Sequence, residues 1–124
     1  MISLVIENYL LIGLGGALGA MMRYVTFLSF RGRDFPWATL IVNVTGSFLL
    51  SVALFIPSHD LWSLSPLVTV GVLGSFTTFS SFSLDTLLLY EERGLRPAVR
   101  NVALNVLLCL SAALLGMYSV LILT

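Results

Sequence analysis

Residues 71–83 form the segment in which the residue types most strongly indicate chemistry. The sequence GVLGSFTTFSSFS contains two glycines and six hydroxyl residues, interleaved with phenylalanines. Glycine weakens a helix, and hydroxyl side chains that bond to the backbone offer it alternatives to the regular helical ladder. We therefore expect a break or irregular turn here, whose freed carbonyl groups could hold a cation. The alternative is that the hydroxyls bond back to their own helix.

Two phenylalanines of this segment, Phe79 and Phe82, are three residues apart and share one helical face. A neighbouring polar face carries Thr78, Ser81 and Asp85. Aromatic rings have positive edges, so a small dehydrated anion could rest against them while hydroxyls and amides donate hydrogen bonds. The alternative is that both rings pack into an apolar core.

Other polar side chains lie within apolar segments, where they normally face protein or water. Arg23 is the sole cation of its segment. It either reaches the lipid headgroups or lines a vestibule that concentrates anions. The amide of Asn43 must bond across helices or line a pore, where its two N–H donors would suit an anion. Asn105 requires a similar explanation, and Asp85 is close enough to a connector to lie at the membrane interface.

The elements that position these residues are membrane-spanning helices. The chain is 58% hydrophobic and only 10% charged, whereas a soluble domain needs roughly a quarter of its residues charged. Crossing the hydrocarbon core takes about 20 apolar residues. Four stretches reach this length within a single transmembrane domain of residues 1–124: 8–30, 37–56, 64–90 and 98–123. The expected fold is an all-α integral membrane protein with antiparallel neighbouring helices and a third helix broken at the midplane.

Several function classes are excluded by composition. A formal net charge of zero provides no basic surface for nucleic acid. Cys109 is the single cysteine, so one chain cannot build a disulfide framework, and the single histidine argues against a histidine metal site. No catalytic or cofactor motif is present, and we expect no enzyme activity. A removed signal peptide is not expected either.

Small residues at helical spacing indicate close helix contacts. Because four helices fill their own centre with side chains, a pathway would need an oligomer. The contacts could therefore lie within one subunit or between subunits. The pairs are Gly15 with Gly19, Ser47 with Ser51, Gly71 with Gly74, and Ala112 with Gly116.

Three motifs resemble the Fluc/CrcB fluoride-channel family over essentially the whole chain. They are GGALGAMMRY at residues 15–24, TLIVN at 39–43 with Gly46, and GSFTTFSSFS at 74–83. The third motif is the most specific of them. The resemblance implies a passive fluoride channel of the bacterial cell membrane, built as an antiparallel dimer. Two fluoride pores would run along the dimer interface, around a central structural sodium ion.

The resemblance also implies roles for individual residues. The backbone carbonyls of Gly74 and Thr77 would bind the sodium, Phe79 and Phe82 would line the pores, and Asn43 would donate to the passing ion. Arg23 would lie in a vestibule. The polar wall of the pore would be formed by Thr39, Thr78, Ser80 and Ser81.

Departures from the family pattern leave alternatives open. Ala38 replaces a glycine, Ser81 replaces a threonine, and polar positions of the fourth helix fall on Cys109 and Ala113. One pore wall would then be incomplete. A four-helix multidrug transporter would instead need a carboxylate in its first helix, where only Glu7 is present. A non-conducting structural subunit would leave the hydroxyl-rich break unexplained.

The charge distribution predicts the orientation in the membrane. Three connectors join the four expected helices, at residues 31–36, 57–63 and 91–97. Five arginines lie in or next to the first and third connectors. The second connector, the residues before the first helix and the residue after the fourth contain no Lys or Arg. Basic residues in short loops stay in the cytoplasm. The chain should therefore insert mainly one way and pair with an oppositely oriented homologue. The alternative is a homodimer of both orientations.

Overall fold

The computed structural model describes residues 2–56 and 66–123, with side chains from Ile6 onward. Every regular element in these residues is helical, and four segments are long and apolar enough to cross a membrane. The prediction of an all-α protein with four membrane-spanning helices is therefore confirmed. The elements are α1 (Ile2–Ser29), α2 (Trp37–Phe55), η1 (Leu67–Leu73), α3 (Gly74–Phe76), α4 (Phe79–Arg93) and α5 (Leu95–Leu123).

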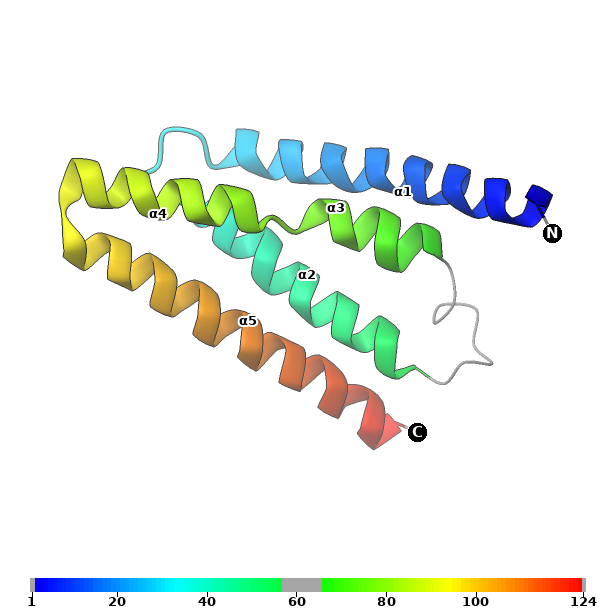
Figure 1. Cartoon of the computed structure of the whole chain (residues 1–124). Coiled ribbons are helices and arrows are strands. Elements are labelled where there is room, and N and C mark those ends of the chain that lie inside the picture. The colour runs from blue at the N-terminus through cyan, green and yellow to red at the C-terminus, as the bar shows by residue number, and fades with distance from the viewer. Residues whose placement is uncertain (1, 57–65, 124) are drawn as a thin grey trace.

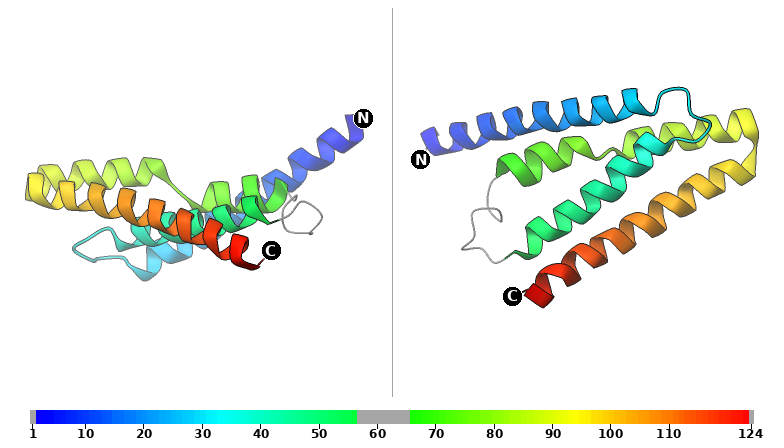
Figure 2. Two further views of the ribbon diagram at one scale, coloured as in Figure 1. Left: turned by 90° about the horizontal axis from the view of Figure 1, so that it is seen from below. Right: turned by 180° about the vertical axis from the view of Figure 1, so that it is seen from behind.

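The third span is shared by η1, α3 and α4, and its break changes its neighbours. Before the break, η1 and α3 lie against α1, whereas α4 lies against α5 after it. Helix α2 packs mainly on α5. Figure 1 shows α1 and α5 at opposite edges of this arrangement, and the views in Figure 2 agree. No close backbone approach joins α1 to α5 in the described ranges, so the subunit is an open assembly rather than a closed bundle.

The close contact between α1 and η1 depends on glycine. A Cβ atom at Gly15 would collide with the carbonyl oxygen of Leu67, and one at Gly19 with that of Val72. From the other side, a Cβ at Gly71 would lie 2.8 Å from the carbonyl oxygen of Ile12. These glycines therefore let backbones meet within one subunit, which settles the choice left open for them by the sequence.

The contact between α2 and α5 is also internal. A Cβ at Gly116 would lie 2.6 Å from the carbonyl oxygen of Phe48, and the hydroxyl of Ser51 donates to the carbonyl of Ala113 at 2.6 Å. Gly74 differs from these positions because it is exposed, and a Cβ built on it would meet only the carbonyl oxygen of Thr69, at an ordinary contact distance of 3.9 Å. Among the glycines of the expected pairs, Gly74 is the one left free for contact with another subunit.

The third connector was expected to span residues 91–97, but in the structure only Gly94 separates α4 from α5. Helix α4 runs to Arg93, Gly94 ends it with a φ of 85° and donates to the carbonyl of Tyr90 at 3.0 Å, and α5 begins at Leu95. Only glycine adopts such a φ at no cost. Pro97 lies in the first turn of α5, where no intrahelical N–H is needed. At the other end of the chain, α1 already begins at Ile2.

The first and third connectors meet at one end of the molecule. A guanidinium nitrogen of Arg93 lies 2.9 Å from a carboxylate oxygen of Asp34, and Arg100 lies over the ring of Phe35 at 4.9 Å. The N-terminal end of α1 and the C-terminal end of α5 both lie at the opposite end, one on each outer edge of the molecule (Figure 1). The arginines of both connectors therefore share one membrane face, which we call the basic end.

Candidate functional site

The break in the third span lies at Thr77 and Thr78, as predicted for this segment. Both residues are extended, with ψ of 155° at Thr77 and φ of −151° at Thr78. The hydroxyl of Thr78 accepts from the amide of Ser81 at 3.1 Å and thereby caps α4. The backbone thus leaves the helix for two residues and starts a new helix with its own cap.

The break diverts two amides from their usual helical acceptors. In a continuous helix, the amide of Thr78 would bond to the carbonyl of Gly74, and the amide of Ser81 to that of Thr77. Here Thr78 donates to Oδ1 of Asn43 at 2.8 Å, and Ser81 donates to the Thr78 hydroxyl. The carbonyls of Gly74 and Thr77 are therefore released from the helical ladder. A guanidinium nitrogen of Arg23 approaches the Thr77 carbonyl at 3.5 Å.

Asn43 on α2 holds the break by two bonds to one residue. Its Oδ1 accepts from the Thr78 amide at 2.8 Å, and its Nδ2 donates to the Thr78 carbonyl at 3.1 Å. One turn further along α2, a Cβ at Gly46 would collide with the methyl group of Thr77. Asn43 and Gly46 together therefore explain how α2 accommodates and fixes the extended residues.

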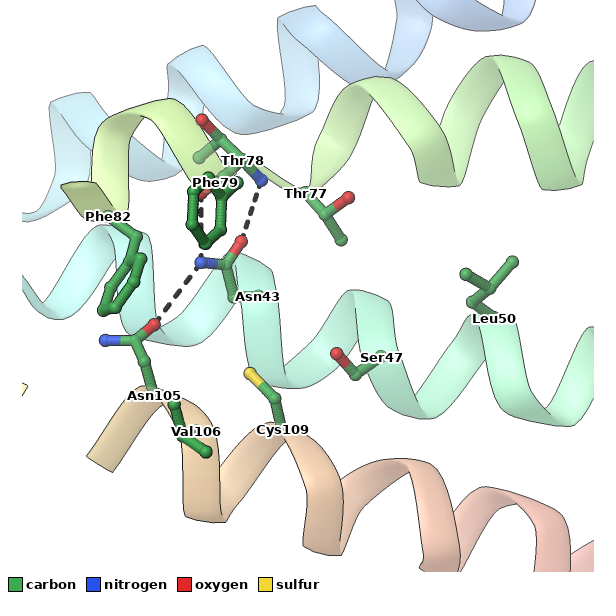
Figure 3. A pocket seen from close by; sticks show the side chains of 10 residues that line it. All are labelled: Asn43, Ser47, Leu50, Thr77, Thr78, Phe79, Phe82, Asn105, Val106 and Cys109. Carbon is green, nitrogen blue, oxygen red and sulfur yellow. Dashed lines mark hydrogen bonds between the residues drawn. The ribbon is translucent and has the colours of Figure 1, made fainter. Parts of the chain in front are cut away.

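A recess of about 330 Å³ opens beside Asn43, between α2, α4 and α5. We call it the Asn43 recess. The rings of Phe79 and Phe82 lie on it, with centroids 5.5 Å apart and planes tilted by 54° (Figure 3). Phe79 is 78% exposed, so its ring stands at the open side. The complete lining is Asn43, Ser47, Leu50, Thr77, Thr78, Phe79, Phe82, Asn105, Val106 and Cys109.

A second recess of about 420 Å³ lies on the other side of the break, against α1. We call it the Arg23 recess. Its lining is Ala20, Arg23, Tyr24, Phe27, Thr78, Ser80 and Ser81. The hydroxyl of Thr78 lies 3.2 Å from that of Ser80 and donates to that of Ser81 at 3.0 Å. Most of the predicted site residues therefore divide between two recesses, and Thr78 borders both. Thr39 and Gly74 line neither.

Thr39 lies in neither recess. It is 1% exposed, and its hydroxyl donates to a carboxylate oxygen of Asp85 on α4 at 2.5 Å. This bond gives Asp85 a partner inside the subunit. Thr39 therefore ties α2 to α4 one turn away from Asn43, towards the basic end.

Helix α5 carries a polar face that was not expected. Asn101 and Asn105 are 0% and 5% exposed, and Cys109 follows on the same face, next to Ser47 in the recess. The spacing of the two asparagines is a signal for this face, because residues four apart in a helix share a face. Ala113 offers its carbonyl to Ser51 and does not line the recess, so the wall formed by α5 begins at Asn105, one turn before Cys109.

Comparisons with known proteins agree with the motifs. The profile of the family described as CrcB-like protein, Camphor Resistance (CrcB), matches residues 10–117. A protein of Aeromonas salmonicida named fluoride-specific ion channel FluC is 43% identical over 117 residues, covering 90% of this chain and 94% of that protein. Proteins of the same name from Magnetococcus marinus and Shewanella sp. ANA-3 are 46% and 47% identical, covering 86% and 89% of this chain and 91% and 93% of theirs.

The family profile spans most of the sequence, and the relatives align over nearly their whole length. The relatives are named as ion channels. This chain belongs to the CrcB family of membrane proteins.

Proposed function

We propose that this protein is a fluoride channel of the cell membrane, and that the Asn43 recess is part of its ion pathway. The observation that carries the proposal is the joint position of Asn43, Phe79 and Phe82 on one recess beside the helix break. The names of the relatives point to the same ion. Because the membrane potential is negative inside, it would drive anions out of the cell through a passive channel.

The chemistry of the recess suits a small anion. Fluoride is strongly hydrated, so a selective pathway must replace its water by closely spaced donors in a narrow space. The tilted rings of Phe79 and Phe82 can present positive edges, and hydroxyls of Ser47 and Thr77 lie on the same recess. Larger halides would not fit between the walls of such a narrow pathway and would be excluded.

The two alternatives have less support. A multidrug transporter of this size needs a carboxylate within its first helix, and Glu7, the acid of α1, lies near the end of that helix and is exposed. A non-conducting structural subunit would not need two recesses at a broken span. Nor would it need the two hydrogen bonds from the Asn43 side chain that hold Thr78 in its extended conformation.

The first test is ion selectivity. Liposomes that contain the conducting assembly and are loaded with potassium fluoride should release fluoride passively once a potassium ionophore balances the charge. Chloride-loaded liposomes should release no more chloride than protein-free ones. Equal release of the two anions would contradict the proposal. Proton-coupled movement of an organic cation would favour the transporter instead.

We also propose that the recess is completed by a second, oppositely oriented subunit. The Asn43 recess opens to the surface beside the helix break and carries amide and hydroxyl groups. Such groups are not tolerated against lipid, where each unsatisfied one costs several kcal/mol. Phe79 is exposed on this recess, and Gly74 is exposed in the same broken span. A partner that covers this face would exclude lipid and form the second wall of the pathway.

The same face would hold a structural sodium ion. The donors would be the carbonyls of Gly74 and Thr77, which the break releases from the helical ladder, and oxygen is the ligand type that such a hard cation takes. In the described residues, no group of three His, Cys, Asp or Glu side chains could form another metal site. Bound sodium would supply positive charge at the interface between the subunits. It would also hold the helix breaks of the two subunits together.

The sodium proposal is tested by binding. Protein dialysed against sodium-free buffer should retain sodium in a stoichiometric amount, measured by atomic emission. A Gly74→Val variant should lose it, because the added side chain would crowd this exposed position between subunits. Gly13→Val is the matched control, since Gly13 is likewise exposed and can take a Cβ without a collision, but lies away from the break. Equal sodium retention in both variants would place the ion elsewhere.

A further inference from the structure

Both N–H groups of the Asn43 side chain already have acceptors within the subunit. One hydrogen of its Nδ2 is directed to the carbonyl of Thr78 at 3.1 Å, and the other to Oδ1 of Asn105 at 3.4 Å (Figure 3). An amide nitrogen has two hydrogens to donate. Any anion that binds to Asn43 must therefore displace one of two existing acceptors.

The orientation of both amides is fixed by backbone groups, whose hydrogen-bonding character is unambiguous. The Thr78 amide can only donate, so the atom of Asn43 that it meets at 2.8 Å must be oxygen. The carbonyl of Asn101 can only accept, so the atom of Asn105 that meets it at 3.1 Å must be nitrogen. The oxygen of Asn105 therefore faces Asn43.

The bonds continue along α5 and return to α4. Nδ2 of Asn105 also donates to Oδ1 of Asn101 at 3.0 Å, and Nδ2 of Asn101 donates to the hydroxyl of Thr86 at 2.9 Å. That hydroxyl donates to the carbonyl of Phe82 at 2.7 Å. The chain of donors thus runs in one direction from Asn43 to Phe82. It holds both hydrogens of Asn105 away from the recess.

We propose that Asn105 is a positioning residue whose side-chain oxygen occupies the place at Asn43 that fluoride takes, and that Asn101 holds Asn105 in this orientation. The inference rests on the proposed function. Of the two acceptors of Asn43, Asn105 is the one that fluoride displaces. Its bond is the longer, it lines the recess with both phenylalanines, and the Thr78 carbonyl belongs to a residue held by a second bond.

This arrangement has a consequence for permeation. An internal acceptor keeps the amide desolvated and aimed without a bound ion, and it competes with fluoride for the same N–H. Competition lowers the affinity for the ion and lets it leave faster. A channel needs sites that bind well enough to admit an ion but weakly enough to release it.

The test measures how conductance saturates with fluoride. In planar bilayers that contain the conducting assembly, Asn105→Leu removes the acceptor at similar volume. The fluoride concentration at half-saturation should fall by about three- to tenfold, the value of one net hydrogen bond, and the maximal conductance should fall with it. Ser51→Ala is the matched control, because it removes another buried hydrogen bond between α2 and α5 and should change neither quantity. An unchanged or higher half-saturation in Asn105→Leu overturns the proposal.

Asn101 tests whether the effect passes through Asn105. Asn101 does not line either recess, so Asn101→Leu should lower the half-saturation less than Asn105→Leu does. Adding Asn101→Leu to Asn105→Leu should have no further effect, which a double-mutant cycle measures. Independent, additive effects would contradict the positioning role of Asn101.

A binding experiment on the unmodified protein covers the case in which variants fail to fold. The chain has four asparagines, so selective ¹⁵N-asparagine labelling gives few side-chain amide signals in nitrogen–proton NMR spectra. Fluoride, but not chloride, should shift the signals of both Asn43 and Asn105. If fluoride shifts Asn43 alone, Asn105 is not displaced and the proposal is wrong. If the protein neither conducts fluoride nor shows any shift, the proposed function itself fails and this inference fails with it.

Discussion

Replacing Phe79 or Phe82 by isoleucine is expected to lower fluoride conductance by about tenfold while the protein still folds. Isoleucine keeps most of the apolar volume but has no positive ring edge. An aromatic edge contact is worth about 0.5–1.5 kcal/mol, and about 1.4 kcal/mol corresponds to a factor of ten. Because the two rings lie 5.5 Å apart on the same recess, an ion that passes one ring also meets the other.

The measurement is single-channel or liposome flux at matched protein density, with gel-filtration profiles to confirm intact protein. Phe79 is 78% exposed in the subunit, so its replacement should cost little folding stability, and a loss of flux would report on the pathway. Phe55→Ile is the control, since Phe55 is an exposed aromatic residue of α2 outside both recesses. Normal conductance in both recess variants would mean that the rings do not line the pathway.

The four spans were predictable because their signal is local. Hydropathy over about 20 residues identifies a membrane helix without reference to its neighbours. The break was predictable for the same reason, since the glycines and hydroxyls that weaken the helix are themselves in the segment that breaks. Asn43 of α2 and the ring pair of α4 lie together on one recess, whereas Thr39 does not.

The remaining features depend on which helices become neighbours. The bond between Asn43 and Asn105 joins residues 62 apart in sequence, and no local pattern reports that α2 packs on α5. The pairing of Thr39 with Asp85 and the division of the site into two recesses have the same origin.

Expressed alone, this chain is expected to insert almost entirely one way and to give little fluoride flux. Its basic end gathers five arginines, whereas the second connector and the other ends of α1 and α5 carry none. The ion pair between Asp34 and Arg93 shows that both connectors lie on one membrane face. Basic residues in short loops remain in the cytoplasm, and acidic residues contribute little to orientation. An antiparallel pair formed by this chain alone would need comparable amounts of both orientations.

A fixed orientation would require a partner that is a homologue with the opposite charge bias. The wall that α5 contributes to the Asn43 recess holds Asn105 and Cys109 in this chain. The expectation of a second gene product rests on orientation, which is a single measurable property.

Labelling with a membrane-impermeant thiol reagent measures that property. A cysteine introduced into the second connector, which lies outside the described residues, would be the only thiol in a Cys109→Ser background. It should react from the outside of intact cells and not from the inside. An Arg31→Gln/Arg96→Gln variant removes two exposed charges but keeps the contacts of Arg93 and Arg100. With the bias weakened, both orientations should appear and flux from the chain alone should rise. If the unmodified chain already labels from both sides and conducts fluoride, a homodimer of two orientations is the correct assembly, because no second protein is then needed to supply the opposite orientation.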